Sequence, residues 1–95
     1  MRVKWLESVR NDLRHHARYI AQDNPTAAKR VVSDIRSSVA NLARYPGLGR
    51  GGRVLGTREL VVARLPYTVV YRVRDRIVEV LAVMHQAREW PESFE

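Results

Sequence analysis

The chain has 95 residues, 45% of them hydrophobic, and a formal net charge of +7 at pH 7. Its periodic apolar residues exclude a disordered chain, and its length leaves room for one domain. The absence of cysteine excludes disulfides and thiolate metal sites, and no apolar run reaches the roughly 20 residues that a membrane helix needs. We therefore predict a single domain over residues 1–95 that is cytoplasmic and does not enter a membrane.

The positive charge predicts an anionic partner, because arginine binds carboxylates and phosphates through its planar fork. Nucleic acid and an acidic protein segment both fit, and the alternative is a basic solvated surface with no specific partner. Six arginines fall between residues 46 and 74 and are opposed only by Glu59; they are Arg50, Arg53, Arg58, Arg64, Arg72 and Arg74. If the strands of this region share one surface, the sheet has a basic face.

The first segments predict a strand and then a helix. Residues 2–6 alternate polar and apolar side chains, as a short strand does. Ser8 is a suitable N-cap for the helix that follows. His15 and His16 are adjacent on this helix and point in different directions, so we interpret them as surface or boundary residues rather than metal ligands. The buried stripe of the helix has spacings of three and four and comprises Val9, Leu13, Ala17 and Ile20.

A second helix is predicted from Pro25 to about Tyr45. Asn24 is a good N-cap, and Pro25 suits the first helical position, where its missing N–H is harmless. Only a few residues join the two helices, so they are expected to form an antiparallel hairpin. The apolar stripe of this helix comprises Ala28, Val31, Val32, Ile35, Val39 and Leu42.

Residues 46–53 contain four glycines and predict an irregular loop. The loop lacks the lysine and the following Ser or Thr of a phosphate-binding P-loop. Its arginines either contact phosphates or a partner's carboxylates, or they belong to a plain connector.

Three strands are predicted after this loop, over residues 59–65, 68–73 and 77–84. Pro66 marks the first turn, and residues 74–76 form the second. Strands joined by such short turns form an antiparallel meander. With the first strand added and the helical hairpin covering one face, we predict an α+β fold of order β-α-α-β-β-β with an antiparallel sheet.

This order, together with several local phrases, resembles the RelE/ParE family of bacterial toxins, on its ParE-like side. The resemblance spans the whole chain. The phrases lie in the same order as in the family, at residues 19–25, 45–50, 56–60, 66–67, 70–73 and 85–91.

The resemblance implies the toxin of a type II toxin–antitoxin system, held inactive by a small antitoxin whose C-terminal portion wraps around it. Members of the ParE branch are associated with poisoning DNA gyrase, whereas members of the RelE branch cut messenger RNA on the ribosome. One fold serves both activities, so the choice between them depends on the residues.

The residues favour binding over RNA cleavage. Ribonuclease members have closely spaced lysines on the strand that matches residues 59–65, and an arginine after the tyrosine that matches Tyr67. This chain has no lysine in its second half, and Thr68 follows Tyr67. We therefore predict a toxin that inhibits DNA gyrase, with no catalytic residue, cofactor or metal. The alternatives are a ribosome-dependent endoribonuclease that uses His85 and Arg88, and a non-toxic nucleic-acid-binding module.

The predicted partner-binding residues lie on the strands and the C-terminal segment. Two readings remain open for Trp90, which either anchors a partner together with Arg88 or packs over the end of the sheet. His85 has a structural alternative too, a hydrogen bond to the backbone at the end of its strand. The complete predicted set is Arg53, Arg58, Tyr67, Tyr71, Arg72, Arg88 and Trp90.

Overall fold

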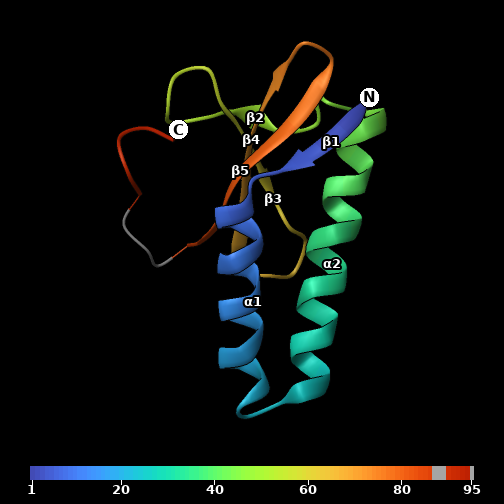
Figure 1. The fold of residues 1–95 in the computed structure, drawn as a ribbon, viewed down its shortest axis with the longest axis vertical. Helices are drawn as coiled ribbons and strands as arrows, with labels where there is room; N and C mark the ends of the chain where they lie inside the picture. The colour runs from blue at the N-terminus through green and yellow to red at the C-terminus, as the bar shows by residue number, and fades with distance from the viewer. Residues whose placement is uncertain (87–89, 95) are drawn as a thin grey trace.

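The computed structural model describes residues 1–86 and 90–94, and it has two helices packed against a five-stranded sheet (Figure 1). This confirms the predicted α+β class and element order, with one short strand added inside the glycine-rich loop. Within the described residues, neither helix is both long and apolar enough to cross a membrane. The elements are β1 (Arg2–Trp5), α1 (Glu7–Ala21), α2 (Pro25–Arg44), β2 (Arg50–Gly51), β3 (Arg58–Val61), β4 (Tyr67–Arg74) and β5 (Ile77–His85).

The two helices begin in different ways, α1 at a residue packed into the core and α2 at a side-chain cap. The prediction that Ser8 caps α1 is wrong, because the N-cap position is Leu6 and no side chain caps this end. Leu6 packs against the core, which starts the helix two residues earlier than the cap pattern suggests. For α2 the prediction is confirmed: Oδ1 of Asn24 accepts a hydrogen bond of 3.0 Å from the N–H of Ala27, and Pro25 occupies the first turn.

The sheet has the strand order β1-β5-β4-β3-β2, and it is mixed rather than antiparallel throughout. Strands β2 to β5 form the predicted antiparallel meander. In contrast, β1 lies parallel to β5, with Val3 opposite Val78. The physical reason is connectivity: β1 is separated from the meander by the whole helical hairpin, and such a crossover lets two neighbouring strands run in the same direction.

The ends of the strands also differ from the sequence pattern. The apolar run at 59–65 predicts a longer strand than β3, which ends at Val61. Arg64 has φ 65°, a left-handed conformation that turns the chain toward β4. The β4–β5 turn is as tight as predicted, since Asp75 and Arg76 both have positive φ, as the two central residues of a type I′ turn do. A bulge at Leu81 shifts the register between β4 and β5.

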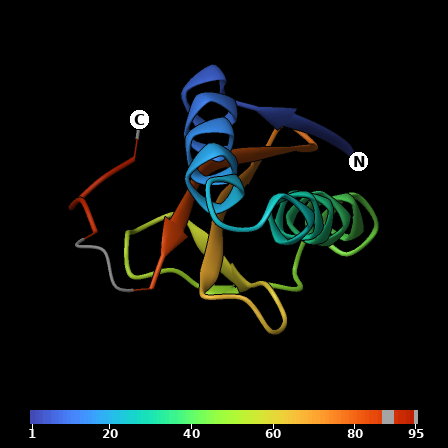
Figure 2. The same ribbon diagram turned by 90° about the horizontal axis from the view of Figure 1, so that it is seen from below.

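The two faces of the sheet are covered by different parts of the chain. The helices cover one face, as Figure 2 shows with both helices seen roughly end-on. On the other face, Trp90 and Phe94 from the C-terminal segment pack against a small cluster near one end of the strands, made of Val70, Ala82 and Met84. The larger core, between helices and sheet, includes Val9, Leu13, Ile35, Val39, Val62, Tyr67, Val69, Val80 and Val83.

Candidate functional site

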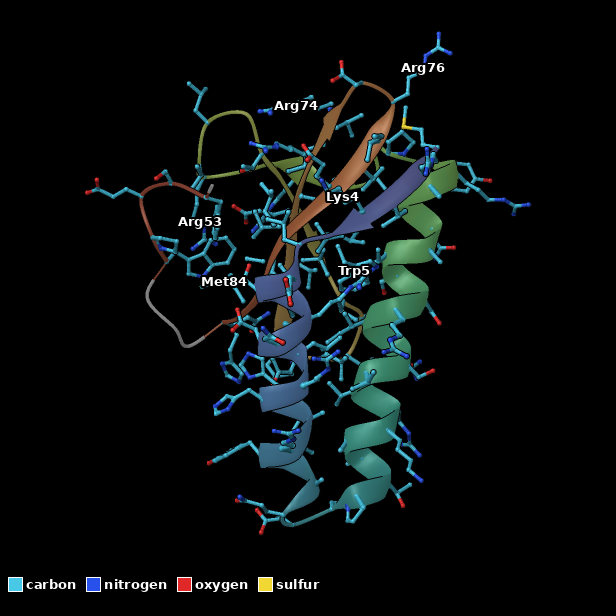
Figure 3. All side chains as sticks on the ribbon, viewed as in Figure 1. Lys4, Trp5, Arg53, Arg74, Arg76 and Met84 are labelled. Atoms are coloured by element: carbon cyan, nitrogen blue, oxygen red, sulfur yellow. The ribbon has the colours of Figure 1, made fainter. Side chains whose placement is uncertain are left out.

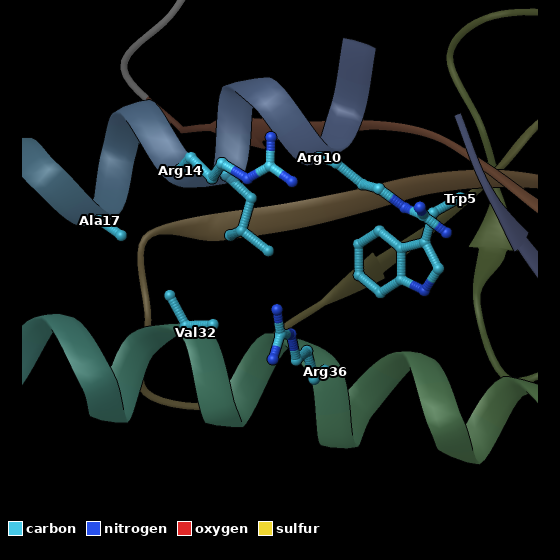
Figure 4. A pocket seen from close by; sticks show the side chains of 7 residues that line it. Trp5, Arg10, Arg14, Ala17, Val32 and Arg36 are labelled. Atoms are coloured by element: carbon cyan, nitrogen blue, oxygen red, sulfur yellow. The ribbon is translucent and has the colours of Figure 1, made fainter. Parts of the chain in front are cut away.

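A groove between α1 and α2 is the main concave feature of the described residues. It consists of two adjoining cavities of about 540 and 620 Å³ that share Ala17, Val32 and Arg36 in their lining. The floor is apolar, with Leu13 from α1, Val32 from α2 and Trp5 at the end of β1. Figure 4 shows the indole of Trp5 at one end of the groove, with Val32 further along it.

The rim of this groove is cationic. None of the lining residues carries a carboxylate. Arg10 and Arg14 extend from α1 and Arg36 from α2, so positive charge lies on both sides of the apolar floor (Figure 4). Arg18 and Lys29 continue the rim along the second cavity. An apolar floor with a cationic rim suits a segment that has one apolar and one acidic face.

The glycine-rich loop after α2 is held in place by buried polar contacts. The hydroxyl of Tyr71 accepts a hydrogen bond of 2.8 Å from the N–H of Gly49 and donates one of 2.7 Å to the carbonyl of Pro46. A Cβ atom on Gly49 would lie 2.7 Å from the Tyr71 ring, so glycine permits this close approach. Arg58 donates a hydrogen bond of 2.8 Å to the carbonyl of Gly49. These contacts give the loop a structural role beyond that of a plain connector.

A buried carboxylate holds the other end of the loop. The side chain of Glu59 is 3% exposed and accepts a hydrogen bond of 2.7 Å from the backbone N–H of Arg53. The guanidinium groups of Arg53 and Arg50 lie 3.3 and 3.5 Å from its oxygens. Burial raises the pKa of Glu59, but the hydrogen bonds and charges of Arg53, together with the charge of Arg50, outweigh it and leave the pKa below its ordinary value.

Arg53 joins this carboxylate to the C-terminal segment. Its Cζ atom lies 3.6 Å from the centroid of the Trp90 ring, a cation–π contact. Trp90 itself packs toward Val70, Ala82 and Met84 and makes an edge-to-face contact with Phe94. The structure therefore supports the reading in which Trp90 packs on the sheet, and it brings together two predicted site residues, Arg53 and Trp90.

The other predicted partner-binding residues are dispersed. Tyr67 and Tyr71 are 5% and 0% exposed, so most of each side chain is packed inside the fold. Arg58 is exposed beside the loop. Arg72 donates a hydrogen bond of 2.8 Å from Nε to Glu79 and lies on the face of the sheet away from the helices. Arg88 lies outside the described residues.

His85 lies in a setting that sequence spacing did not reveal. The ring of Tyr67 makes edge-to-face contacts with both His85 and His16, each with 5.3 Å between ring centroids. These three side chains line a cavity of about 510 Å³. Burial raises the pKa of Tyr67, so its phenol stays protonated at neutral pH. No group of three or more His, Asp or Glu side chains in the described chain is placed to hold a metal ion.

The grouping of His16, Tyr67 and His85 could not be read from spacing alone. His16 and His85 are far apart in the chain, and only the packing of α1 on the sheet brings both imidazoles to Tyr67. Glu59 did leave a signal, since an acidic residue inside an otherwise apolar strand is typical of a buried, paired carboxylate.

Comparisons with known proteins agree with this fold over nearly the whole chain. The model of the ParE toxin of the type II toxin–antitoxin system parDE matches residues 3–90. "Putative toxin Y4kP" of Sinorhizobium fredii is 45% identical over 91 residues, which cover 96% of this chain and 94% of that protein. "Toxin RelE2" of Caulobacter vibrioides is 36% identical over 86 residues, covering 90% and 96%. A chain of the chromosomal ParDE TA system from P. aeruginosa has a TM-score of 0.79 at 28% identity, covering 90% of this chain and 95% of that chain. The chain therefore belongs to the ParE toxin family of type II toxin–antitoxin systems.

Proposed function

We propose that the protein is a toxin whose cognate antitoxin neutralises it by laying an acidic, amphipathic segment in the groove between α1 and α2. The observation that carries this proposal is the lining of the groove, an apolar floor between cationic rims with no carboxylate. Apolar side chains of the segment would bury against Leu13, Ala17 and Val32. Its carboxylates would pair with the arginines on either side, which also discourages basic competitors.

The arrangement of the rim suggests the form of the bound segment. Cations lie on both helices, so an inserted helix with one apolar stripe would meet positive charge on each flank. An antitoxin segment that is disordered alone would gain its order only when its apolar stripe is covered.

The groove is tested by co-purification with the protein encoded next to this chain. Val32→Glu places a carboxylate in the apolar floor, and Arg36→Glu reverses a rim charge. Each is expected to weaken the complex by about tenfold or more, because both oppose an acidic, apolar ligand. Isothermal titration calorimetry and size-exclusion chromatography measure the change.

Arg30→Glu is the matched control, since Arg30 is exposed on α2 and does not line the groove. The two arginine variants should retain the wild-type unfolding transition, and Val32→Glu, which introduces a charge beside the core, is compared only after thermal unfolding shows that it is folded. Equal affinity of the Val32→Glu and wild-type proteins for the antitoxin would remove the groove from the interface.

We further propose that the toxin acts by inhibiting DNA gyrase rather than by cutting RNA. Three polar side chains of the sheet that could otherwise act on RNA are engaged in structural contacts. Glu59 is buried and ion-paired, and so is not available as a surface base. Tyr67 is buried and protonated. Arg72 is engaged with Glu79. A binding mechanism requires none of these side chains to transfer protons, and partner contacts by Arg53, Arg58, Arg88 and Trp90 stay part of the proposal.

Brief induction of the toxin distinguishes the two activities. Gyrase inhibition is expected to raise DNA-damage signalling and to block supercoiling by purified gyrase, while the ends of messenger RNA stay unchanged. RNA-end mapping and a gel-based supercoiling assay give the two readouts. New cuts within translated codons, with supercoiling unaffected, would contradict gyrase as the target.

One observation favours the ribonuclease alternative, namely the cavity that His16, Tyr67 and His85 line together. Three imidazoles line this cavity, and the two that contact Tyr67, those of His16 and His85, could serve as general acid and base. The matched test is His85→Ala: if RNA cuts appear with the wild-type toxin and vanish in this variant, the alternative replaces gyrase inhibition. His15→Ala is the control, because His15 is exposed and lines the same cavity without contacting Tyr67 in a ring pair.

A further inference from the structure

The face of the sheet away from the helices carries a second basic surface, at the end opposite Trp90. Val3 and Trp5 pack toward the helices, so Arg2 and Lys4 point to the other side. By the same alternation, Arg72 and Arg74 of β4 lie on this open face, since Tyr71 packs against Leu42 of α2.

Strand register arranges these cations in two rows across three strands. Arg2 of β1 lies opposite Ile77, which lies opposite Arg74. Lys4 lies opposite Glu79, which lies opposite Arg72. Cross-strand neighbours are about 5 Å apart and successive rows about 7 Å apart. We call the set of Arg2, Lys4, Arg72, Arg74 and Arg76, with Glu79 among them, the basic platform.

The platform keeps a net positive charge that a ligand can reach. Glu79 is bound by Arg72 at 2.8 Å, and Nε of Arg74 is 4.0 Å away. The hydrogen bond from Arg72, with the charges of Arg72, Arg74 and Lys4, keeps the pKa of Glu79 below its ordinary value. With Asp75 in the adjoining turn, two carboxylates stand among five cations. Within the described part of the chain, Arg2, Lys4 and Arg76 take part in no salt bridge. Arg76 projects beyond the tip of the β4–β5 hairpin, as Figure 3 shows.

We propose that the basic platform binds the phosphate backbone of duplex DNA. A charged surface whose only apolar member is the half-buried Ile77 offers no floor for a protein helix, unlike the groove between α1 and α2. Single strands are held largely by bases stacked on aromatic rings. The platform has no aromatic side chain, and Trp90 is covered by Arg53 at 3.6 Å. A duplex presents dense phosphate charge and needs only cations to match it.

This inference is independent of gyrase as the target, because it concerns purified toxin and DNA alone. The platform also lies far from His85. Eight residue steps along β5 separate Ile77 from His85, about 26 Å, and the two lie on opposite faces of the sheet. A backbone bound on the platform is therefore not presented to the cavity around Tyr67.

The test is fluorescence anisotropy of a labelled 25-base-pair duplex with the purified full chain, over a series of salt concentrations. The double variant Arg74→Gln/Arg76→Gln is compared with Arg30→Gln/Arg64→Gln, which removes the same charge from exposed positions away from the platform. Each lost phosphate contact should make the slope of log K against log salt shallower by about 0.9. The platform variant is expected to lose about 1.8 in slope and on the order of 10- to 100-fold in affinity at 0.1 M salt.

The control variant should retain the wild-type slope, and thermal unfolding checks that each variant is folded. Lys4→Gln provides a second platform variant on a different strand, expected to lose one contact. The proposal is overturned if the platform and control variants lose affinity equally, because net charge alone then explains binding. It is also overturned if a single strand of the same length binds more tightly than the duplex, or if an acidic peptide displaces the duplex at equal charge concentration.

Discussion

Glu59 is a single buried carboxylate that organises the loop after the helical hairpin. It accepts a hydrogen bond from the backbone of Arg53 and lies close to two guanidinium groups. Arg53 in turn stacks on Trp90. One ionised side chain therefore links β3, the loop and the C-terminal segment, and its protonation state affects all three.

Glu59→Gln keeps the shape of this side chain and removes its charge. We expect a loss of about 1–3 kcal/mol in the free energy of unfolding, because hydrogen bonds to a charged acceptor become neutral ones. Urea unfolding at pH 7 measures it. Glu92→Gln at an exposed position should change stability by no more than about 0.5 kcal/mol.

The same variant tests the pH dependence. The pKa of Glu59 is lower in the folded state than its ordinary value of 4.5, so the unfolded chain binds protons first as pH falls. The stabilisation is complete above pH 4.5 and is lost as pH falls through the folded-state pKa. Wild type should therefore lose stability more steeply than Glu59→Gln below pH 4.5. Glu79 has a lowered pKa too and contributes a slope of the same sign in both proteins. Parallel pH curves for the two proteins would contradict this account.

At the scale of elements, the two helices start for different reasons. Asn24 caps α2 through its side chain, whereas α1 begins after Leu6 because that residue is packed into the core. A capping residue can be recognised in the sequence, because it acts on the next three residues. A helix that begins at a buried residue cannot be recognised in this way, because the burial depends on a neighbouring strand.

Asn24→Ala removes a cap that the structure shows, and Ser8→Ala removes one that only the sequence pattern suggested. Asn24→Ala should destabilise the protein by about 0.5–2 kcal/mol, since an N–H in the first turn of α2 loses its partner. Ser8→Ala should have an effect below about 0.5 kcal/mol. Thermal unfolding of both variants under one condition gives the comparison. Equal losses would mean that Ser8 contributes to the start of α1 after all.

At the scale of the whole molecule, the sheet presents two different surfaces on its open face. Trp90 and Phe94 cover the apolar end, made of Val70, Ala82 and Met84, and the basic platform occupies the other end. The groove between the helices lies on the opposite side of the sheet. Two anionic partners of different chemistry could therefore be bound without sharing a residue.

Trp90→Ala uncovers the apolar end of the sheet. Because Trp90 is half-buried, we expect a loss of about 1–3 kcal/mol and increased binding of a hydrophobic dye. Trp90→Phe should retain most of the stability, since an aromatic ring still covers the cluster. Unchanged dye binding in Trp90→Ala would show that the C-terminal segment does not protect this face.

The elements that depend on local chemistry could be predicted from the sequence alone. Asn24-Pro25 marks the start of α2, apolar periodicity marks both helices, and the short turns at Pro66 and Asp75 impose an antiparallel meander. The α+β class and the family followed, because the order and spacing of these elements are properties of the chain.

The pairings between distant segments became visible only in the folded protein. No short sequence pattern predicts that β1 lies parallel to β5, that His16 contacts Tyr67, or that Arg53 stacks on Trp90. The buried hydroxyl of Tyr71 and the open basic platform have the same origin, since each depends on which face of the sheet a residue occupies. Alternation along a strand is visible in sequence, but the face that the helices cover is set by packing, and packing is a property of the whole molecule.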